Sequence, residues 1–265
     1  KNIEKKELLK FKVHNVPITD TFSIKVKNIL KFNSYKAIIF DLYPAHNIVN
    51  FDKLCKEIKR NKILLISIDS LFEYSDILDF IWVPSTNFND KKYQKISKKI
   101  KTGWDSLLIQ KRLAQKEWVP GKNLLVLTGG SDFYQLGNTL PTQLDSSLDN
   151  DVQVHWVKGP FSNYPVMPKE CRLNWNIHNN PEYLDDLIVQ SNYVMTVFGV
   201  SFFEVLQYGI PTVVFSPNMS KDSMDLVAIE KEGVALVSKN IQIAIRDIIE
   251  LMNNNELSEI YSSQA

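Results

Sequence analysis

The chain has 265 residues, 44% of them hydrophobic and 23% charged, which is typical of a globular protein with room for two modest α/β domains or one large one. Its formal net charge of +1 gives no overall field to attract nucleic acid or an anionic membrane, so neither is an expected partner. Two cysteines are too few for a disulfide framework, no apolar run approaches the roughly 18 residues of a membrane span, and the opening residues do not resemble a signal peptide. We therefore expect a cytoplasmic protein without a transmembrane segment.

The first half of the chain alternates strand-like and helical patterns. Buried strands are expected at residues 37–40, 63–68 and 81–83. Between the first two, apolar residues recur at helical spacing: Phe51, Leu54, Cys55 and Ile58. Asp41 and Asp69 follow the first two strands, where parallel sheets place ligands. Each carboxylate could instead cap the next element or turn, and both interpretations remain open.

A lysine-rich stretch and a linker close this half. Residues 89–101 carry apolar side chains at helical spacing among lysines, which predicts a solvated amphipathic helix. Residues 112–123, around Pro120, are expected to link two domains. The predicted domains are therefore residues 1–111 and residues 124–265.

The α/β pattern resumes after the linker. Strands are expected at residues 124–128, 152–157, 194–198, 212–215 and 234–237. Helices are expected after Pro181 and Gly199, at residues 225–232, and after the N-cap residue Asn240. Because strands and helices alternate throughout, the fold class is expected to be α/β with doubly wound parallel sheets.

Two glycine turns follow strands in this half. Gly129-Gly130-Ser131 comes after the first strand, and Gly199 leads through Ser201 into a helix. Free backbone N–H groups at such turns favour phosphate, although a glycine turn is often only structural. Glu204 lies in the first helical turn, where it can cap the helix or accept hydrogen bonds from a ribose. Together these features favour the binding of a nucleotide diphosphate.

Metal and nucleophile motifs are not apparent in the sequence. The four histidines (His14, His46, His155, His178) have no metal-ligand spacing. We expect His155 to be a hydrogen-bonded strand histidine, His178 to lie in an Asn-rich loop, and His46 to face a cleft. No phosphate-binding Walker loop or nucleophile elbow is present, so no metal or cofactor is expected.

These residues resemble a known family. The second half is similar to the donor-binding domain of GT-B nucleotide-sugar enzymes, closest to PseG-type UDP-sugar hydrolases and more distantly to MurG-type glycosyltransferases. The segments that carry the resemblance are Gly129-Gly130-Ser131-Asp132, Gly199-x-Ser201-x-x-Glu204 and Gly209-Ile210-Pro211, with Ile39-Phe40-Asp41-Leu42-Tyr43, Ile68-Asp69-Ser70 and Gly103-Trp104-Asp105-Ser106-Leu107-Leu108 upstream. It implies a GT-B-like fold of two Rossmann-type domains with parallel sheets, the N-terminal one incomplete.

The resemblance also implies a set of site residues. Glu204 would hydrogen-bond the ribose, and the base would pack near Asn176 and Ile177. The residues expected around the diphosphate are Gly129, Gly130, Ser131, Gly199, Val200 and Ser201. Asn218 would stand where relatives carry polar residues that face the donor sugar.

The sequence differs from the PseG-type family in the residues expected to carry out catalysis. PseG-type hydrolases begin with a strand and a Gly-x-Gly-His turn that supplies the catalytic base, and no such turn occurs in this sequence. The remaining catalytic candidates are Asp41 and His46, on the acceptor side near Tyr43. Without the first strand one sheet edge is left unpaired, which makes self-association a further expectation.

The sequence thus predicts a nucleotide-sugar-dependent, glycosyltransferase-like protein of polysaccharide or surface-glycan biosynthesis. It would bind a UDP- or CMP-sugar in an interdomain cleft, together with a sugar acceptor, and would stabilise the leaving diphosphate with helix N-termini. Two alternatives remain. One is a PseG-type nucleotide-sugar hydrolase whose catalytic His lies outside this chain, and the other is a non-catalytic nucleotide-sugar or partner-binding protein.

Overall fold

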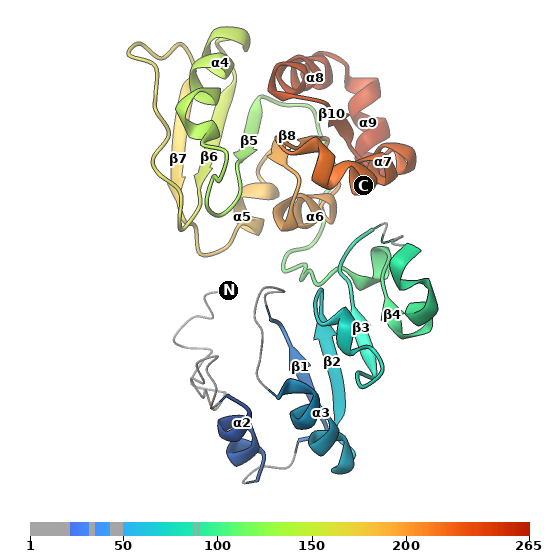
Figure 1. Ribbon diagram of the computed structural model, residues 1–265. Coiled ribbons are helices and arrows are strands. Elements are labelled where there is room, and N and C mark those ends of the chain that lie inside the picture. Colours follow the sequence, from blue (N-terminus) through green and yellow to red (C-terminus); the bar gives the residue numbers. More distant parts are fainter. Residues whose placement is uncertain (1–21, 32–34, 43–49, 87, 89–90) are drawn as a thin grey trace. The chain divides into compact units, whose positions relative to one another are not determined.

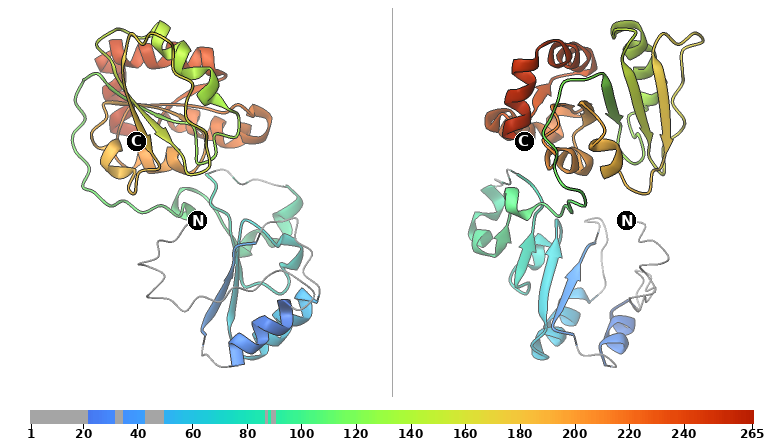
Figure 2. Two further views of the ribbon diagram at one scale, coloured as in Figure 1. Left: turned by 90° about the vertical axis from the view of Figure 1, so that its left-hand side faces the viewer. Right: turned by 180° about the vertical axis from the view of Figure 1, so that it is seen from behind.

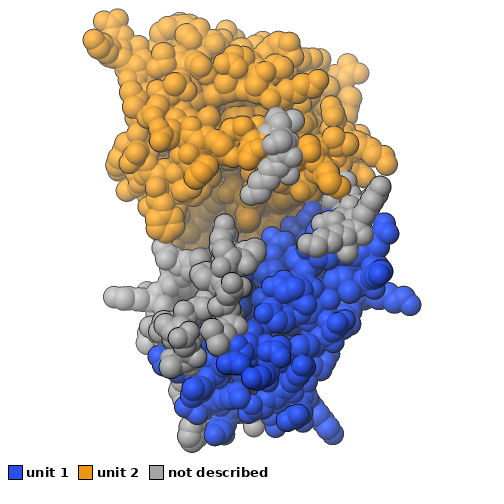
Figure 3. Space-filling view, viewed as in Figure 1, with its two compact units in different colours: residues 1–106 blue, residues 107–265 orange. Residues whose placement is uncertain are grey.

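A computed structural model describes residues 22–31, 35–42, 50–86, 88 and 91–265. The chain divides into two compact units, residues 1–106 and residues 107–265 (Figure 3). His46 and Tyr43, which the sequence places among the acceptor-side residues, lie outside the described residues.

Unit 1 contains a four-stranded parallel sheet in the order β1-β2-β3-β4 (Figure 1). Its described elements are α2 (Phe22–Lys31), β1 (Ala37–Phe40), α3 (Phe51–Arg60), β2 (Leu64–Ile68), β3 (Phe80–Trp82), β4 (Ile100–Lys101) and the 3₁₀ helices η1 (Phe72–Tyr74), η2 (Lys91–Lys99) and η3 (Trp104–Ser106). The helix expected at residues 89–101 is therefore a 3₁₀ helix that leads into a short strand.

The core of unit 1 lies on one face of this sheet. The buried residues Phe40, Leu65 and Ile81 point to that face from three neighbouring strands. Apolar side chains of α2 and α3 pack against them, because the predicted helical spacing places Phe51 and Leu54 on one side of α3.

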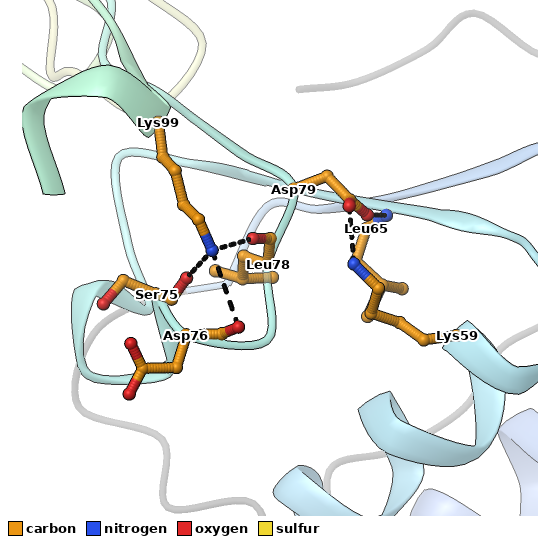
Figure 4. A network of polar contacts seen from close by, with 7 residues as sticks. All are labelled: Lys59, Leu65, Ser75, Asp76, Leu78, Asp79 and Lys99. Atoms are coloured by element: carbon orange, nitrogen blue, oxygen red, sulfur yellow. Dashed lines mark hydrogen bonds and ion pairs between the residues drawn. The ribbon is translucent and has the colours of Figure 1, made fainter.

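Two charged side chains hold the connection between β2 and β3 (Figure 4). Asp79 accepts hydrogen bonds from the Lys59 ammonium at 2.5 Å and from the Leu65 backbone N–H at 2.9 Å. Lys99 donates to the backbone carbonyls of Ser75 at 2.6 Å and Leu78 at 3.0 Å. Burial alone would raise the pKa of Asp79, but the hydrogen bonds from Lys59 and Leu65 outweigh it and lower that pKa.

Unit 2 contains a six-stranded, entirely parallel sheet in the order β10-β9-β8-β5-β6-β7. Its strands are β5 (Asn123–Leu127), β6 (Gln153–Lys158), β7 (Asn174–Asn179), β8 (Tyr193–Val197), β9 (Thr212–Phe215) and β10 (Leu236–Ser238). Its helices are η4 (Leu136–Asn138), α4 (Leu140–Ser147), α5 (Asp185–Ile188), α6 (Val200–Leu206), α7 (Met219–Glu232), α8 (Ile241–Asn253) and α9 (Asn255–Gln264). This is the doubly wound arrangement that the alternating pattern predicts.

Helices cover both faces of the unit 2 sheet (Figure 2). Leu124 and Val126 of β5 belong to the core cluster beneath α4 and α8. Leu125 and Leu127, the alternate residues of the same strand, belong to the cluster beneath α5 and α6. Because β5 is buried on both faces, nearly all of its side chains are apolar, and its sequence is an uninterrupted apolar run after Asn123. At the start of α8, Asn240 Oδ1 accepts a hydrogen bond from the Ile243 N–H at 2.9 Å, which confirms the predicted cap.

The segment that precedes β5 runs along unit 2 as a strap. Residues 107–122 contain no helix or strand. The Arg112 N–H donates to the Tyr208 hydroxyl at 3.1 Å, and the Trp118 indole N–H donates to the Asn192 carbonyl at 2.7 Å. The strap is therefore attached to unit 2 at two points.

Candidate functional site

The two predicted glycine turns lie side by side in unit 2. The chain adds β6 and β7 on one side of β5 and then crosses to add β8 on the other side, so the order of strands in the sheet changes direction between β5 and β8. These two strands pair in parallel, with Leu127 beside Thr196. Each turn follows the carboxyl end of one of these strands. A Cβ built on Gly129 would lie 3.7 Å from a methyl carbon of Val197, so the first turn lies against the end of β8, from which the second turn continues. Open parallel sheets bind ligands at this switch point.

A cavity of about 150 Å³ opens between these turns. Its lining includes Thr128, Gly129, Gly130, Gly159, Asn180 and Ser201. Whole small-molecule sites usually measure roughly 300–1,000 Å³, so the cavity has the size of a subsite, such as one for a phosphate group and part of a ribose.

Backbone geometry shapes the first turn. Gly129 has a φ of +85°, a conformation that side-chain-bearing residues rarely adopt. The Phe161 N–H donates to the Gly130 carbonyl at 2.9 Å, which joins this turn to the segment after β6. Asp132 accepts hydrogen bonds from the N–H groups of Leu136 at 2.9 Å and Gly137 at 2.8 Å. Its carboxylate therefore caps η4, while Gly130 and Ser131 stay exposed.

A buried hydroxyl group lies at the base of this turn. Thr128 is 6% exposed and lines the cavity. Its Oγ1 has no hydrogen-bond partner among the described residues. A buried polar atom without a partner usually costs about 1–3 kcal/mol. Thr128 therefore adds an unpartnered hydroxyl group to the residues of the cavity wall.

The second turn leads into α6. Val200, the first residue of this helix, is exposed, and Ser201 lines the cavity. Glu204 is half-buried and lies three residues after Ser201, so both side chains share one side of α6. The structure thus brings Gly129, Gly130 and Ser201 to one cavity, whereas Gly199 is not among its lining residues.

Asn218, Asn176 and Ile177 lie apart from the cavity lining. Asn218 follows β9 at the same edge of the sheet, and its backbone N–H donates to the Ser216 hydroxyl at 3.0 Å. Asn176 and Ile177 lie within β7, and Ile177 packs against the core beneath α4 and α8. The residues near the end of β7 that line the cavity are Asn180, Pro181 and Leu184.

A histidine pair lies beside the cavity wall. His155 Nδ1 and His178 Nε2 are 3.0 Å apart, and the stacked ring centroids are 5.3 Å apart. This confirms the expected hydrogen-bonded strand histidine at 155 and corrects the expected loop at 178, because His178 belongs to β7 and pairs with Val157 of the wall. Burial lowers the pKa of both imidazoles, and the neighbouring His178 lowers that of His155 further.

Unit 1 carries the remaining described candidate. Asp41 is exposed and follows β1, and Asp69 follows the neighbouring strand β2. Two buried hydroxyl groups of the same region, Ser67 Oγ and Ser70 Oγ, have no partner among the described residues. The carboxyl edge of this sheet therefore gathers two carboxylates and two buried hydroxyl groups.

Two further observations concern the described part of the chain alone. No group of three or more His, Cys, Asp or Glu side chains in it is arranged to hold a metal ion. No helix in it combines the length and apolar composition that a bilayer span requires.

Comparisons with known proteins place the fold. No protein-family model matches the chain, and no curated protein matches its sequence. Among solved structures, MurG from Acinetobacter baumannii aligns with a TM-score of 0.58 and 11% identity, over 92% of this chain and 72% of that one. CalG4, the calicheamicin glycosyltransferase, aligns with a TM-score of 0.54 and 13% identity, over 92% and 71%. The S. aureus MnaA–UDP structure aligns with a TM-score of 0.51 and 10% identity, over 95% and 75%.

Identities this low show the fold alone. The chain has the α/β, GT-B-like fold with parallel sheets that the sequence predicts, with four described strands in unit 1 and six in unit 2. The closer resemblance to PseG-type hydrolases stays a prediction.

Proposed function

We propose that this chain binds a nucleotide-sugar, UDP- or CMP-linked, at the switch point of unit 2 and is a glycosyltransferase-like protein of polysaccharide or surface-glycan biosynthesis. One observation carries the proposal. The Gly129-Gly130 turn after β5 and Ser201 at the start of α6, far apart in the sequence, line one cavity together with Thr128, whose buried hydroxyl has no partner among the described residues. The UDP in the MnaA structure, which has a similar fold, supports the choice of ligand.

The parts of the ligand would be divided among the lining residues. Backbone N–H groups of Gly130, Ser131, Val200 and Ser201 would surround the diphosphate, because turns after parallel strands offer free donors to anions. Glu204 would accept hydrogen bonds from the ribose.

The base would lie toward the end of β7. Asn180 offers an amide to the polar edge of the base, and Leu184 offers an apolar surface to its face. Asn176 and Ile177, where the base is expected from the sequence, lie within this strand, a few residues before Asn180, and Ile177 packs against the core.

The reaction would be glycosyl transfer. The bond between the anomeric carbon and the phosphate oxygen of the nucleotide breaks, so that UDP or CMP leaves, the acceptor oxygen bonds to that carbon, and the acceptor proton passes to a base. Donors preorganised around the leaving diphosphate would stabilise its developing charge, typically the largest contribution to such catalysis. Asp41 and His46 are the proposed candidates for the base.

Calorimetric titration with UDP, CMP and their sugars tests the site. We expect binding of one nucleotide family by the native chain, a two- to tenfold weaker affinity in Thr128→Val, and little change in Thr128→Ser, which keeps the hydroxyl. The range corresponds to about 0.5–1.5 kcal/mol for one neutral hydrogen bond. If no nucleotide binds, the proposal fails. If nucleotides bind equally to Thr128→Val, the ligand lies elsewhere.

A further inference from the structure

Two loops beside the cavity are joined to each other. The first comprises residues 130–139, between β5 and α4, and the second comprises residues 159–166, after β6. The Phe161 N–H donates to the Gly130 carbonyl at 2.9 Å, and the Val166 N–H donates to the Gly137 carbonyl at 2.7 Å. These bonds lie near opposite ends of the loops, so the loops form one defined surface.

This surface exposes four aromatic side chains, which we name the aromatic rim. Phe133 is 80% exposed, Phe161 75%, Tyr164 62% and Tyr134 44%. The rings of Phe133 and Tyr134 meet edge to face with centroids 5.2 Å apart. The Lys158 ammonium lies 5.2 Å from the centroid of Tyr164. Single exposed apolar residues are common, but such a gathering on one surface usually marks a binding site.

The chemistry of the rim indicates its occupant. Residues with hydroxyl and amide side chains neighbour these aromatic residues in the sequence of the two loops: Ser131, Gln135, Ser162 and Asn163. A pyranose ring has an apolar C–H face, which suits the electron-rich face of an aromatic ring, and hydroxyl groups at its edge, which suit such polar neighbours.

The charges around the rim disfavour a lipid surface. In and next to the two loops in the sequence, the lysines Lys158 and Lys169 are matched in number by the acids Asp132 and Glu170. Surfaces that bind anionic membranes instead carry a cluster of basic residues around their apolar side chains.

The rim is also continuous with the candidate nucleotide site. Gly130 and Pro160 line the cavity and belong to the two loops, and Phe161 follows Pro160 directly. A molecule on the rim therefore lies next to the proposed diphosphate position.

We propose that the aromatic rim is a carbohydrate-binding subsite that receives a glycan chain, so that the acceptor of this protein is an oligosaccharide or polysaccharide. The proposal rests on the proposed function for its link to transfer. The rings bind the apolar faces of successive sugar units, and the polar side chains between them bind the hydroxyl groups.

The test compares three proteins: the native chain, the double variant Phe133→Ser/Phe161→Ser, and the control Val227→Ser. Val227 lies on α7 and is 61% exposed, so the control removes another exposed apolar side chain that lies outside the two loops. Because all three side chains are exposed, we expect equal melting temperatures. Each protein is applied to a printed array of bacterial glycans, and the oligosaccharide retained best is titrated by calorimetry. UDP and vesicles of phosphatidylcholine with phosphatidylglycerol are titrated in parallel.

We expect the native chain and Val227→Ser to retain glycans, and the double variant to bind the best oligosaccharide at least tenfold more weakly, with equal affinity for UDP in all three. A blank array for the native chain, or unchanged glycan affinity in the double variant, overturns the inference. If the glycan array is blank, and the native chain binds vesicles but the double variant does not, then the rim contacts a membrane and the inference is wrong. If none of the three proteins binds UDP, the proposed nucleotide site is refuted. Glycan binding that the double variant loses would still support the aromatic rim as a carbohydrate-binding subsite.

Discussion

The backbones of Gly159 and Gly130 are in direct contact. A Cβ built on Gly159 would lie 2.4 Å from the Gly130 carbonyl oxygen and 2.6 Å from the Gly130 Cα. Real Cβ atoms do not approach backbone atoms so closely, so the end of β6 sets the position of the turn after β5. The shape of the cavity therefore depends on the close packing of these two glycine backbones.

Gly159→Ala should consequently distort the turn. Overpacking of this kind usually costs about 1–3 kcal/mol, so we expect a lower melting temperature and weaker nucleotide binding. Gly130→Ala is the matched control for stability, because its Cβ would meet only Pro160 Cδ at 3.9 Å. Differential scanning calorimetry of both variants checks the prediction, and equal melting temperatures would contradict it.

Asp145→Asn should destabilise unit 2. Asp145 is buried and accepts hydrogen bonds from the N–H groups of Arg172 and Leu173 and from the Trp175 indole, at 3.0–3.1 Å. Burial alone would raise the pKa of Asp145, but these bonds outweigh it and lower that pKa. An amide cannot accept all of them, and a hydrogen bond to a charged group is worth about 1.5–3 kcal/mol. Urea unfolding should show a loss of that order, and an unchanged midpoint would count against the network.

The histidine pair should make stability depend on pH. The pKa values of His155 and His178 are lowered in the folded chain, so the unfolded chain takes up protons first as the pH falls below about 6.5, the usual histidine value. Stability should be complete above that pH and should decrease as the pH falls toward the lowered values. Urea unfolding between pH 7.5 and 5.5 measures the effect. The variant His155→Gln/His178→Gln should show a flatter profile, and identical profiles would refute the assignment.

Tyr208→Phe should release the strap. The Tyr208 hydroxyl donates to Asp185 and accepts from the N–H groups of Arg112 at 3.1 Å and Leu113 at 3.2 Å. Without it, the Asp185 carboxylate and the N–H groups of Arg112 and Leu113 lose a partner, and we expect a loss of about 1 kcal/mol. Limited trypsin digestion should then cut faster after Lys111 and Arg112. Tyr164→Phe, which changes an exposed tyrosine in the same way, should digest like the native chain, and equal rates for both variants would contradict the prediction.

Much of the fold can be predicted from local pattern. The strand at residues 37–40 matches β1, because four consecutive apolar residues end at an aspartate. The strand at 212–215 matches β9, because Gly209 and Pro211 end the preceding helix. The two glycine turns and the Asn240 cap follow from residue type alone.

The missed features depend on tertiary context. Strand β7 consists of Asn174–Asn179, a polar edge strand without an apolar run, so His178 resembles part of a loop until β6 pairs with it. The lysine-rich Lys91–Lys99 segment has the apolar spacing of an α-helix but forms a 3₁₀ helix before β4.

Cavity residues were harder to predict than turns. The cavity is also lined by Gly159, Asn180 and Leu184, because β6 lies beside β5 and β7 beside β6. The order of strands in a sheet cannot be predicted from local sequence patterns. A glycine after the strand at residues 152–157 was the one available signal. Its importance lies in the contact with Gly130, which a sequence does not reveal.

The pairing of β5 with β8 has a consequence for biosynthesis. Leu124 lies beside Tyr193, and the intervening chain forms β6, β7 and their connections. Closing so long a loop has a large entropic cost, and proteins rich in such non-local contacts fold slowly. One turn of the candidate site leaves the ribosome well before the other, so the nascent chain has no complete pocket until β8 and α6 have emerged. A nucleotide that binds there would therefore stabilise the finished sheet rather than guide its early assembly, and would protect the protein mainly against unfolding.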